Sequence, residues 1–333
     1  MSAKKLKVVV TRKLPAPVEL RLKELFDARL NDDDHPFTQD ELAEAMQTAD
    51  VLVPTVTDKL DGRIMARAGD QLRLIAQFGA GVDNIDVDAA TERGIFVVNT
   101  PQAPAEAVAE YVAGALVLFP RRMMEAERAV RKGDWGFRNQ THGPELQGRT
   151  LGIVGFGRIG RRIAEICGLG FGMRILYSDA FPAPPEEEAR LSAERVELEA
   201  LLASADFITL NVPLLDSTYH LINETTLNKM QPHAVLINCS RGPVIDEAAL
   251  VEALQTNKIA GAIIDVYEEE PVDPSNPLLT LDNILVTPHC SGHSLESAQN
   301  MSMVAADIIR VLQGQKPECP VNDPQNPRQP LSG

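Results

Sequence analysis

The chain has few cysteines and no long apolar run. Its 333 residues include four cysteines, Cys167, Cys239, Cys290 and Cys319, and none of them forms a C-x-x-C pair. Scattered cysteines in a chain of this size are typical of reduced thiols in a cytoplasmic protein, and they predict no metal site. The apolar run at 8–10 falls short of the roughly 7–15 residues of a signal peptide, and no stretch approaches the roughly 20 residues of a membrane span. We therefore expect a cytoplasmic protein without a membrane partner.

Basic residues are also scarce. Lysine and arginine number 32 against 47 aspartates and glutamates, which gives a formal net charge of −15. Nucleic acids and acidic membranes bind to basic faces, so this balance argues against either partner. A small anion would have to be held by locally placed cations or by backbone N–H groups. Hydrophobic residues make up 44% of the chain, which allows a large core, and the length favours two domains.

Short β-branched runs alternate with helical stretches, which is typical of α/β proteins. In the first hundred residues the pattern predicts strands and helices in turn, and an apolar helix at 104–121 then leads to a loop at 133–147. That helix is equally compatible with a core position and with a subunit contact. The expected strands lie at 7–11, 51–54, 72–77, 95–98, 150–154, 174–178, 207–210, 234–238, 261–265 and 284–287. The other expected helices lie at 18–30, 61–68, 87–92, 161–167 and 295–313, before a loose tail at 317–333.

A glycine-rich turn follows the strand expected at 150–154. It reads Gly155-Phe156-Gly157-Arg158-Ile159-Gly160, with a helix after it. In a dinucleotide fold the first glycine permits the turn, the second lets the backbone approach a pyrophosphate, and the third lets the helix lie close to the strand. The pyrophosphate is then held by the free N–H groups at the helix N-terminus. The strand–turn–helix context makes this G-x-G-x-x-G a predicted dinucleotide site.

The preferred dinucleotide follows from an acidic residue further on. Asp179 closes the next expected strand, 19 residues after Gly160. A carboxylate about 20 residues past the turn grips the adenine ribose hydroxyls. It would also repel a 2′-phosphate, and Ala180, Phe181 and Pro182 offer no cation in its place. The sequence therefore predicts NAD as the cofactor.

Three segments at the ends of later strands carry groups suited to reducing a 2-oxo acid. The first contains Arg241 followed by Gly242, the second runs from Asp265 to Glu270, and the third contains His289. An arginine can grip a carboxylate with two hydrogen bonds, and a histidine beside a carboxylate is a natural proton donor. Each residue alone also has an ordinary structural explanation: a surface ion pair, a solvated acidic run or a core histidine. Their occurrence on successive strand ends after a dinucleotide turn favours a catalytic site.

With these motifs the chain resembles the D-2-hydroxyacid dehydrogenase family over nearly its whole length. The resemblance implies that Arg241 binds the substrate carboxylate, that His289 is the acid/base, and that Glu270 rather than its neighbours supports the histidine. It further implies substrate contacts from the backbone near Ala80 and Gly81. The cofactor contacts implied beyond Asp179 and the turn residues Gly155, Gly157, Arg158, Ile159 and Gly160 are Val212, Pro213, Cys239 and, at the nicotinamide carboxamide, Asp265.

The same resemblance implies the architecture. We expect an α/β protein of two Rossmann-like, doubly wound domains, with an NAD-binding domain (100–287) inserted into a flavodoxin-like substrate-binding domain (1–99 and 288–333). Similar enzymes are usually homodimers joined largely through their NAD-binding domains.

Two members of the family remain as candidates for the substrate, a small 2-oxo or 2-hydroxy acid. D-3-phosphoglycerate dehydrogenases carry an R-S-R-T segment where this chain has Pro54-Thr55-Val56-Thr57, without arginine. That difference favours glyoxylate and hydroxypyruvate reductases. The stretch at 99–110 is more similar to that of the D-3-phosphoglycerate dehydrogenases and favours that enzyme instead. A third possibility, of another class, is an NAD(H)-sensing corepressor, because the same fold and triad occur in such binding proteins.

Overall fold

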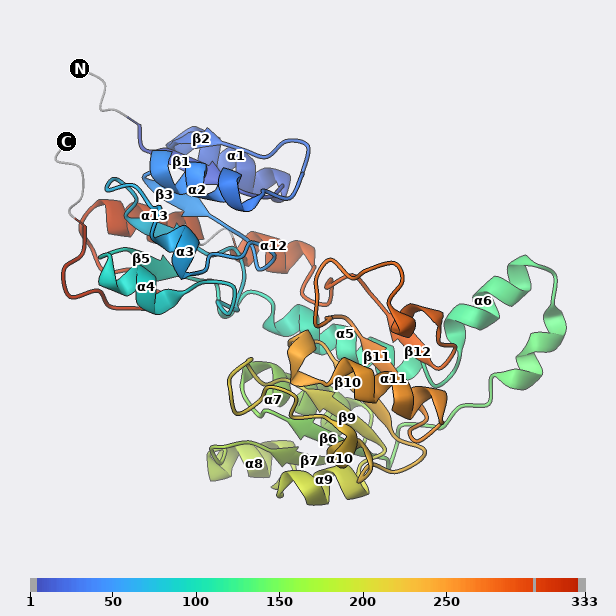
Figure 1. Cartoon of the computed structure of the whole chain (residues 1–333). Coiled ribbons are helices and arrows are strands. Elements are labelled where there is room, and N and C mark those ends of the chain that lie inside the picture. The colour runs from blue at the N-terminus through green and yellow to red at the C-terminus, as the bar shows by residue number, and fades with distance from the viewer. Residues whose placement is uncertain (1–4, 302–303, 329–333) are drawn as a thin grey trace. The chain divides into compact units, whose positions relative to one another are not determined.

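The chain folds into two α/β units. The computed structural model describes residues 5–301 and 304–328 (Figure 1). One unit comprises residues 1–104 and 294–333, and the other comprises 105–293. The boundaries expected from the sequence, 99/100 and 287/288, lie a few residues earlier. The boundaries shift because the helix after residue 104 packs on the second unit and His289 is hydrogen-bonded within it.

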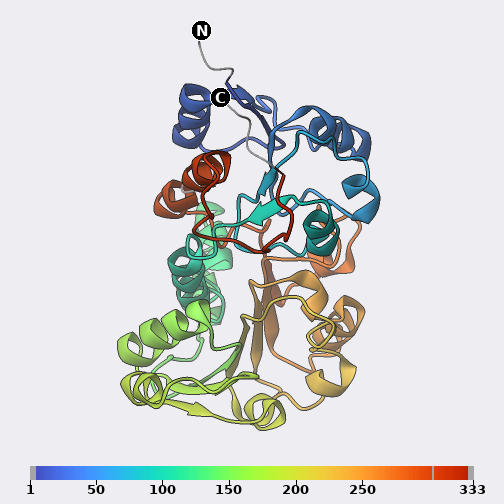
Figure 2. The same cartoon turned by 90° about the vertical axis from the view of Figure 1, so that its left-hand side faces the viewer.

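The first unit is built on a five-stranded parallel sheet in the order β2-β1-β3-β4-β5. This is the flavodoxin-like strand order, as expected. Helices from both ends of the chain belong to the unit, and α12 and α13 lie with it in Figure 2. Its elements are β1 (Lys7–Val10), α1 (Ala16–Leu25), β2 (Asp27–Arg29), α2 (Gln39–Thr48), β3 (Val51–Val53), α3 (Gly62–Met65), β4 (Leu74–Ala76), α4 (Val87–Glu92), β5 (Phe96–Val98), α12 (Leu295–Met301) and α13 (Val304–Leu312). Residues 302–303, within the single helix expected at 295–313, lie outside the described part.

The helix expected at 18–30 is wrong at its C-terminal end. The apolar residues Leu22, Phe26 and Leu30 recur every four positions, as on a helix face. In the structure Phe26 is already extended, and its N–H caps the helix by donating to the Leu22 carbonyl. Residues 27–29 then pair with β1 as the edge strand β2. Tertiary pairing overrides the local spacing here, because a short parallel edge strand carries little sequence signal of its own.

The loose tail expected at 317–333 is also wrong for its described part, residues 317–328. Val321 donates its N–H to the Val97 carbonyl at 2.8 Å, and Val97 donates back to Asn322 Oδ1 at 2.8 Å. Arg328 reaches the Leu72 carbonyl with Nη1 at 2.8 Å. These hydrogen bonds hold the described part of the tail beside β5. Residues 329–333 lie outside the described residues.

The second unit contains a seven-stranded parallel sheet in the order β12-β11-β10-β9-β6-β7-β8. The strand order reverses between β6 and β9, as in a Rossmann fold, so the two doubly wound domains expected from the sequence are confirmed. Its strands are β6 (Thr150–Val154), β7 (Arg174–Ser178), β8 (Ala193–Arg195), β9 (Phe207–Leu210), β10 (Val235–Asn238), β11 (Gly261–Ile264) and β12 (Ile284–Val286). Its helices are α5 (Ala105–Leu118), α6 (Met123–Arg131), η1 (Trp135–Gln140), α7 (Arg158–Ala164), η2 (Glu165–Gly170), α8 (Pro185–Leu191), α9 (Leu198–Ser204), α10 (Glu224–Leu227), η3 (Gly242–Val244), α11 (Glu247–Gln255) and η4 (Pro277–Thr280).

Apolar side chains cover both faces of this sheet. One core contains α5, α7 and the β6 residues Leu151 and Ile153, and the other contains α9, α11 and the β10 residue Leu236. The inner strands β6, β9, β10 and β11 are almost entirely buried and are predominantly apolar, because a central parallel strand is covered on both faces. Helix α5 packs on α7 and belongs to the first of these cores. No helix in the described part of the chain is both long and apolar enough to cross a membrane.

The loop expected at 133–147 contains a 3-10 helix, η1, and is preceded by α6, which the sequence did not predict. The two pack against each other, and α6 lies apart from the sheet of its unit in Figure 1. Several large apolar side chains on this α6–η1 arm are exposed: Met123, Met124, Val130 and Trp135. A surface of this kind is typical of an interface with another chain.

Candidate active site

The predicted site residues of the second unit all follow strands that end at one edge of its sheet. Asn238 pairs with Leu210 and with Ile264, and Ile264 pairs with Val286, so β9 to β12 end in register. On the other side of the switch point, Val154 pairs with Leu210. The segments that follow these strands contain Gly155, Val212, Pro213, Cys239, Arg241, Asp265, Glu270 and His289. Ligands of open α/β sheets bind at this edge, next to the strand-order reversal.

The glycine turn has the shape a dinucleotide needs. Gly155 has a φ of 92°, which favours glycine, and a β-carbon there would lie 2.6 Å from the Asn211 carbonyl oxygen. A β-carbon on Gly160 would lie 2.2 Å from the Gly155 carbonyl oxygen. A β-carbon on Gly157 would meet no described atom within 4 Å, because the turn is open on that side. The residues present therefore fit the pyrophosphate of a bound dinucleotide, with Gly157 lining the open side.

This contrast predicts opposite effects for two alanine substitutions. Gly157→Ala should leave the thermal unfolding midpoint near the parental value and weaken NADH binding at least about 10-fold, because the new methyl group occupies the ligand's space. Gly160→Ala should instead lower the unfolding midpoint, because its methyl group would overlap a backbone carbonyl. Thermal unfolding and NADH fluorescence titration measure the two effects. Unchanged NADH affinity in a folded Gly157→Ala variant would contradict the assignment of the turn.

Asp179 joins the turn to the end of β7. Its Oδ2 accepts a hydrogen bond from the Phe156 N–H at 2.6 Å, and its Oδ1 accepts one from the Phe181 N–H at 2.9 Å. Arg195 Nη2 donates to the Asp179 main-chain carbonyl at 2.9 Å, so a cation does approach this residue from β8. The sequence did not indicate that cation. The carboxylate is held beside the turn, where the ribose of a dinucleotide would lie in the predicted arrangement.

Glu270 and His289 form a hydrogen-bonded pair. Glu270 Oε2 lies 2.7 Å from His289 Nδ1, and Glu270 Oε1 accepts from the Tyr267 N–H at 3.1 Å. A carboxylate only accepts, so Nδ1 carries the proton of this bond and Nε2 is the nitrogen that can exchange a proton with a substrate. His289 itself has a left-handed backbone, with a φ of 51°. A non-glycine residue in that conformation costs energy and is often found at functional sites.

Arg241 follows β10, and the next residue, Gly242, packs against the segment that leads to Glu270. A β-carbon on Gly242 would lie 1.8 Å from the Tyr267 carbonyl oxygen, so the two segments touch backbone to backbone. Tyr267 in turn contacts Glu270. The Arg241 guanidinium donates to the Ser240 carbonyl at 2.7 Å, and the Arg241 carbonyl accepts from Asn238 Nδ2 at 2.8 Å. The chain of contacts Gly242–Tyr267–Glu270–His289 thus links the three predicted catalytic segments.

Asp265 is fully buried, and its carboxylate is bonded to the segment that carries His289. Oδ1 accepts from Thr287 Oγ1 at 2.6 Å and from the Cys290 N–H at 2.9 Å. Oδ2 accepts from the Ser291 N–H at 2.8 Å. These three bonds use three of the roughly four acceptor positions of a carboxylate. The predicted contact with the nicotinamide carboxamide stays a prediction, and the structure adds a second task for Asp265 in holding this turn.

In the first unit, the predicted substrate loop is fixed through its carbonyl groups. Asn99 Nδ2 donates to the Ala80 carbonyl at 2.6 Å, and the buried Gln77 donates through Nε2 to the Gly81 carbonyl at 3.1 Å. Among the described residues, the N–H groups of Ala80 and Gly81 donate to no protein acceptor. Backbone N–H groups left without a partner in a rigid loop can bind an anion.

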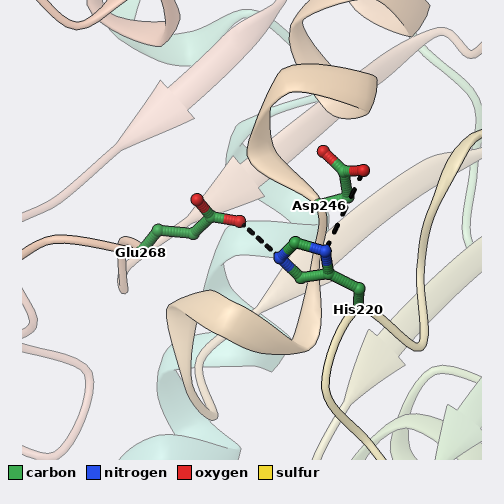
Figure 3. A group of neighbouring side chains, drawn as sticks. All are labelled: His220, Asp246 and Glu268. Carbon is green, nitrogen blue, oxygen red and sulfur yellow. Dashed lines mark hydrogen bonds and ion pairs between the residues drawn. The ribbon is translucent and has the colours of Figure 1, made fainter.

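A histidine between two carboxylates lies in the same unit as Arg241 (Figure 3). Glu268 Oε1 is 2.8 Å from His220 Nε2, and Asp246 Oδ2 is 3.9 Å from His220 Nδ1. Three groups of this kind can hold a metal ion. The two carboxylates, however, face opposite ring nitrogens, so one ion bound to one nitrogen would leave the other carboxylate behind the ring. We interpret the group as a hydrogen-bonded bridge between the segment after β9 and the segment that leads to Glu270.

Comparisons with known proteins agree with this geometry. The family described as "D-isomer specific 2-hydroxyacid dehydrogenase, NAD binding domain" matches residues 113–291. The chain is 42% identical over 320 residues to a glyoxylate reductase of Korarchaeum cryptofilum, covering 95% of this chain and 96% of that one. The chain belongs to the D-isomer specific 2-hydroxyacid dehydrogenase family. It is therefore an NAD-dependent oxidoreductase.

Other members of the family are similar to different extents. A D-3-phosphoglycerate dehydrogenase of Methanocaldococcus jannaschii is 42% identical over 297 residues, covering 88% of this chain but 56% of that one. The solved structure of a glyoxylate reductase from Paecilomyes thermophila superposes with a TM-score of 0.83 at 30% identity, covering 96% of this chain and 99% of that one. Membership of the family is therefore compatible with more than one 2-oxo acid as the substrate.

Two residues that are hydrogen-bonded next to the His289 segment were not predicted from the sequence. From the sequence, Thr287, two residues before His289, has no predicted role, and Tyr111 is predicted only as part of the apolar helix at 104–121. Tyr111 Oη lies 2.7 Å from Thr287 Oγ1. The available signal was a hydroxyl in a helix whose other inward residues are apolar, because a half-buried phenol usually finds a hydrogen-bond partner.

Proposed function

We propose that this dehydrogenase reduces a small 2-oxo acid, glyoxylate or hydroxypyruvate, to the corresponding 2-hydroxy acid with NADH. The observation that carries the proposal is the Glu270–His289 pair, at the same sheet edge as the glycine turn. A proton donor beside a dinucleotide site is what carbonyl reduction requires.

Each proposed role follows from the chemistry of its side chain. NADH, when bound, supplies the hydride that goes to the carbonyl carbon. His289 Nε2 gives a proton to the carbonyl oxygen, while Glu270 holds the ring through Nδ1 and stabilises its protonated form. Arg241 grips the substrate carboxylate and thereby orients the carbonyl. The backbone N–H groups of Ala80 and Gly81 are the further substrate contacts that the family resemblance suggests.

The charges around the 54–57 turn, among the residues that the structure describes, support a substrate without phosphate. That turn contains no basic residue. Arg12 reaches it with a hydrogen bond from Nη1 to Thr57 Oγ1 at 3.1 Å. The same guanidinium is paired with Asp34 through two bonds, at 2.9 and 3.1 Å, which balance its charge. The Korarchaeum relative named glyoxylate reductase, matched along nearly its whole length, supports the same choice.

A panel of 2-oxo acids tests the proposal. NADH oxidation would be followed at 340 nm with glyoxylate, hydroxypyruvate, pyruvate and 3-phosphohydroxypyruvate, each at millimolar concentration. We expect the highest kcat/KM for glyoxylate or hydroxypyruvate. A clear preference for the phosphorylated acid would replace the proposal with a phosphoglycerate dehydrogenase. Tight NADH binding without turnover of any acid would favour the corepressor-like alternative.

The cofactor preference is a second test. We expect kcat/KM with NADH to exceed that with NADPH by roughly 100-fold, because the Asp179 carboxylate and a 2′-phosphate repel each other at close range. Asp179→Ser should narrow the ratio, mainly by improving the KM for NADPH, since Arg195 then lies near the phosphate without an opposing charge. Initial rates with both cofactors measure the ratio. Equal kcat/KM for NADH and NADPH in the parent protein would contradict the role of Asp179.

We further propose that the protein is a cytoplasmic homodimer. The exposed apolar residues of the α6–η1 arm support a contact with a second copy. Among the described residues Cys167, Cys239 and Cys290 form no disulfide, as is usual in a reducing compartment. Sedimentation equilibrium should give twice the 36.3 kDa mass of the chain. Trp135→Ser should shift the equilibrium toward monomer, and a monomeric parent protein would rule the dimer out.

A further inference from the structure

Three hydroxyl groups surround the segment that presents His289. Thr287, two residues earlier, donates through Oγ1 to Asp265 Oδ1 at 2.6 Å. Tyr111, on α5, lies 2.7 Å from the same Thr287 oxygen, and Tyr267 donates from its hydroxyl to the Thr287 carbonyl at 3.0 Å. Residues that are far apart in sequence therefore converge on one threonine.

The direction of the hydrogen bonds follows from the carboxylate. The Asp265 carboxylate can only accept, so the single hydroxyl proton of Thr287 is committed to it. Tyr111 must then be the donor in its bond to Thr287 Oγ1. Burial, opposed by the hydrogen bond to Thr287, raises the pKa of Tyr111, so the phenol keeps its proton and remains a donor at physiological pH. Tyr111 therefore donates to Thr287, and Thr287 donates to Asp265. Hydrogen bonds in such a chain strengthen one another.

Asp265 transmits this chain to His289. Its carboxylate holds the Cys290 and Ser291 N–H groups, and its main-chain carbonyl accepts the His289 N–H at 2.7 Å. The segment needs such restraint because His289 has a φ of 51°. A residue in that conformation persists only when its surroundings fix it. Asp265 is buried completely, so loss of a donor to its carboxylate is not made good by water.

We propose that Tyr111 is a positioning residue for His289 and acts through Thr287 and Asp265. The proposal rests on the proposed role of His289 as proton donor. Tyr111 touches neither substrate nor cofactor in this view. Its hydroxyl orients the Thr287 hydroxyl and hence the Asp265 carboxylate, which fixes the turn at 287–291. A small displacement of an acid/base group costs much of the rate without weakening ground-state binding.

The decisive variant is Tyr111→Phe, which removes one oxygen and keeps the ring. We expect kcat for the best acid of the panel to fall about 10-fold, whereas the KM for the acid and the dissociation constant of NADH change less than about two-fold. Thr287→Val should show the same split, and Thr287→Ser, which keeps the hydroxyl, should recover most of the lost kcat. The double variant Tyr111→Phe/Thr287→Val should be no slower than Thr287→Val, because both changes break one chain.

Tyr177→Phe is the matched control. The Tyr177 hydroxyl is also hydrogen-bonded, accepting from the Ala183 N–H at 2.9 Å and donating to Glu188. Tyr177 lies on β7, and both of these partners are remote in sequence from the 287–291 turn. This variant should keep the parental kcat. If it lost as much as Tyr111→Phe, the effect would be general loosening of the core and the proposal would fail.

A measurement without substrate or cofactor separates this inference from the proposed function. In protein labelled with ¹³C-histidine, the His289 ring signals, assigned with His289→Gln, should move or broaden in Tyr111→Phe and stay in place in Tyr177→Phe. If the parent reduces no 2-oxo acid but the signals move, the proposed function fails and the positioning contact stands. If the parent is active and Tyr111→Phe retains both kcat and the His289 signals, the positioning role is overturned.

Discussion

His289→Gln should lower kcat for 2-oxo acid reduction by a factor of roughly 10²–10⁴, the usual contribution of a positioned general acid. Glutamine can still bond to Glu270 and has a similar size, but it cannot give up a proton. NADH affinity should stay near the parental value, because the cofactor contacts lie in other segments. Steady-state rates and NADH fluorescence titration measure the two quantities. A variant that turned over at the parental rate would remove His289 from the mechanism.

A second histidine supplies the control for this experiment. His233 also faces a carboxylate, with Nε2 3.0 Å from Asp206 Oδ1, but both residues precede their strands and so lie at the opposite edge of the sheet. His233→Gln removes a histidine–carboxylate pair of the same kind and should leave kcat unchanged. The kcat of Glu270→Gln should lie between those of His289→Gln and His233→Gln. The neutral amide still orients the His289 ring, but it no longer stabilises the charged form of the ring.

The strands and the glycine turn could be predicted because local physics determines them. Strands such as β6 and β9 are buried on both faces, so they must be apolar runs, and the turn after β6 needs glycines for steric reasons visible in the structure. Elements with a weaker local sequence signal are not predicted. The sequence pattern does not predict α2, although Thr38 and Glu41 form a capping box. It predicts a helix at the residues of β2, because the strand that pairs with β2 is distant in sequence.

The acidic run at 268–270 marks the limit of prediction from the residues alone. Three successive glutamates are chemically equivalent in the sequence, and only resemblance to a family singled out Glu270. The structure separates two of them by their partners: Glu268 bonds to His220, and Glu270 bonds to His289. Which carboxylate meets which histidine depends on how segments distant in sequence pack together. Gly242 and Tyr267, for example, touch across 25 residues, and no local pattern encodes such a contact.

Arg241→Ala should lower kcat/KM by about 10²–10⁴-fold, because a bidentate arginine–carboxylate contact contributes two charge-assisted hydrogen bonds of roughly 1.5–3 kcal/mol each. Part of the loss should be a higher KM for the acid, and part a lower kcat, because the carboxylate grip also orients the carbonyl. NADH affinity should not change. Equal kcat/KM in variant and parent would reject the role.

Arg241→Lys distinguishes charge from geometry at this position. Lysine keeps the positive charge but offers a single nitrogen where arginine presents a planar fork. If the fork orients the carbonyl, lysine should recover the KM for the acid more fully than it recovers kcat. If charge alone matters, both constants should recover together. Arg149→Ala is the matched control, because its guanidinium pairs with Asp206 at 3.1 Å, at the sheet edge remote from the glycine turn. Arg149→Ala should keep the parental kcat/KM, because its guanidinium does not bind the acid; a loss as large as that of Arg241→Ala would show that the effect is not specific to the guanidinium after β10.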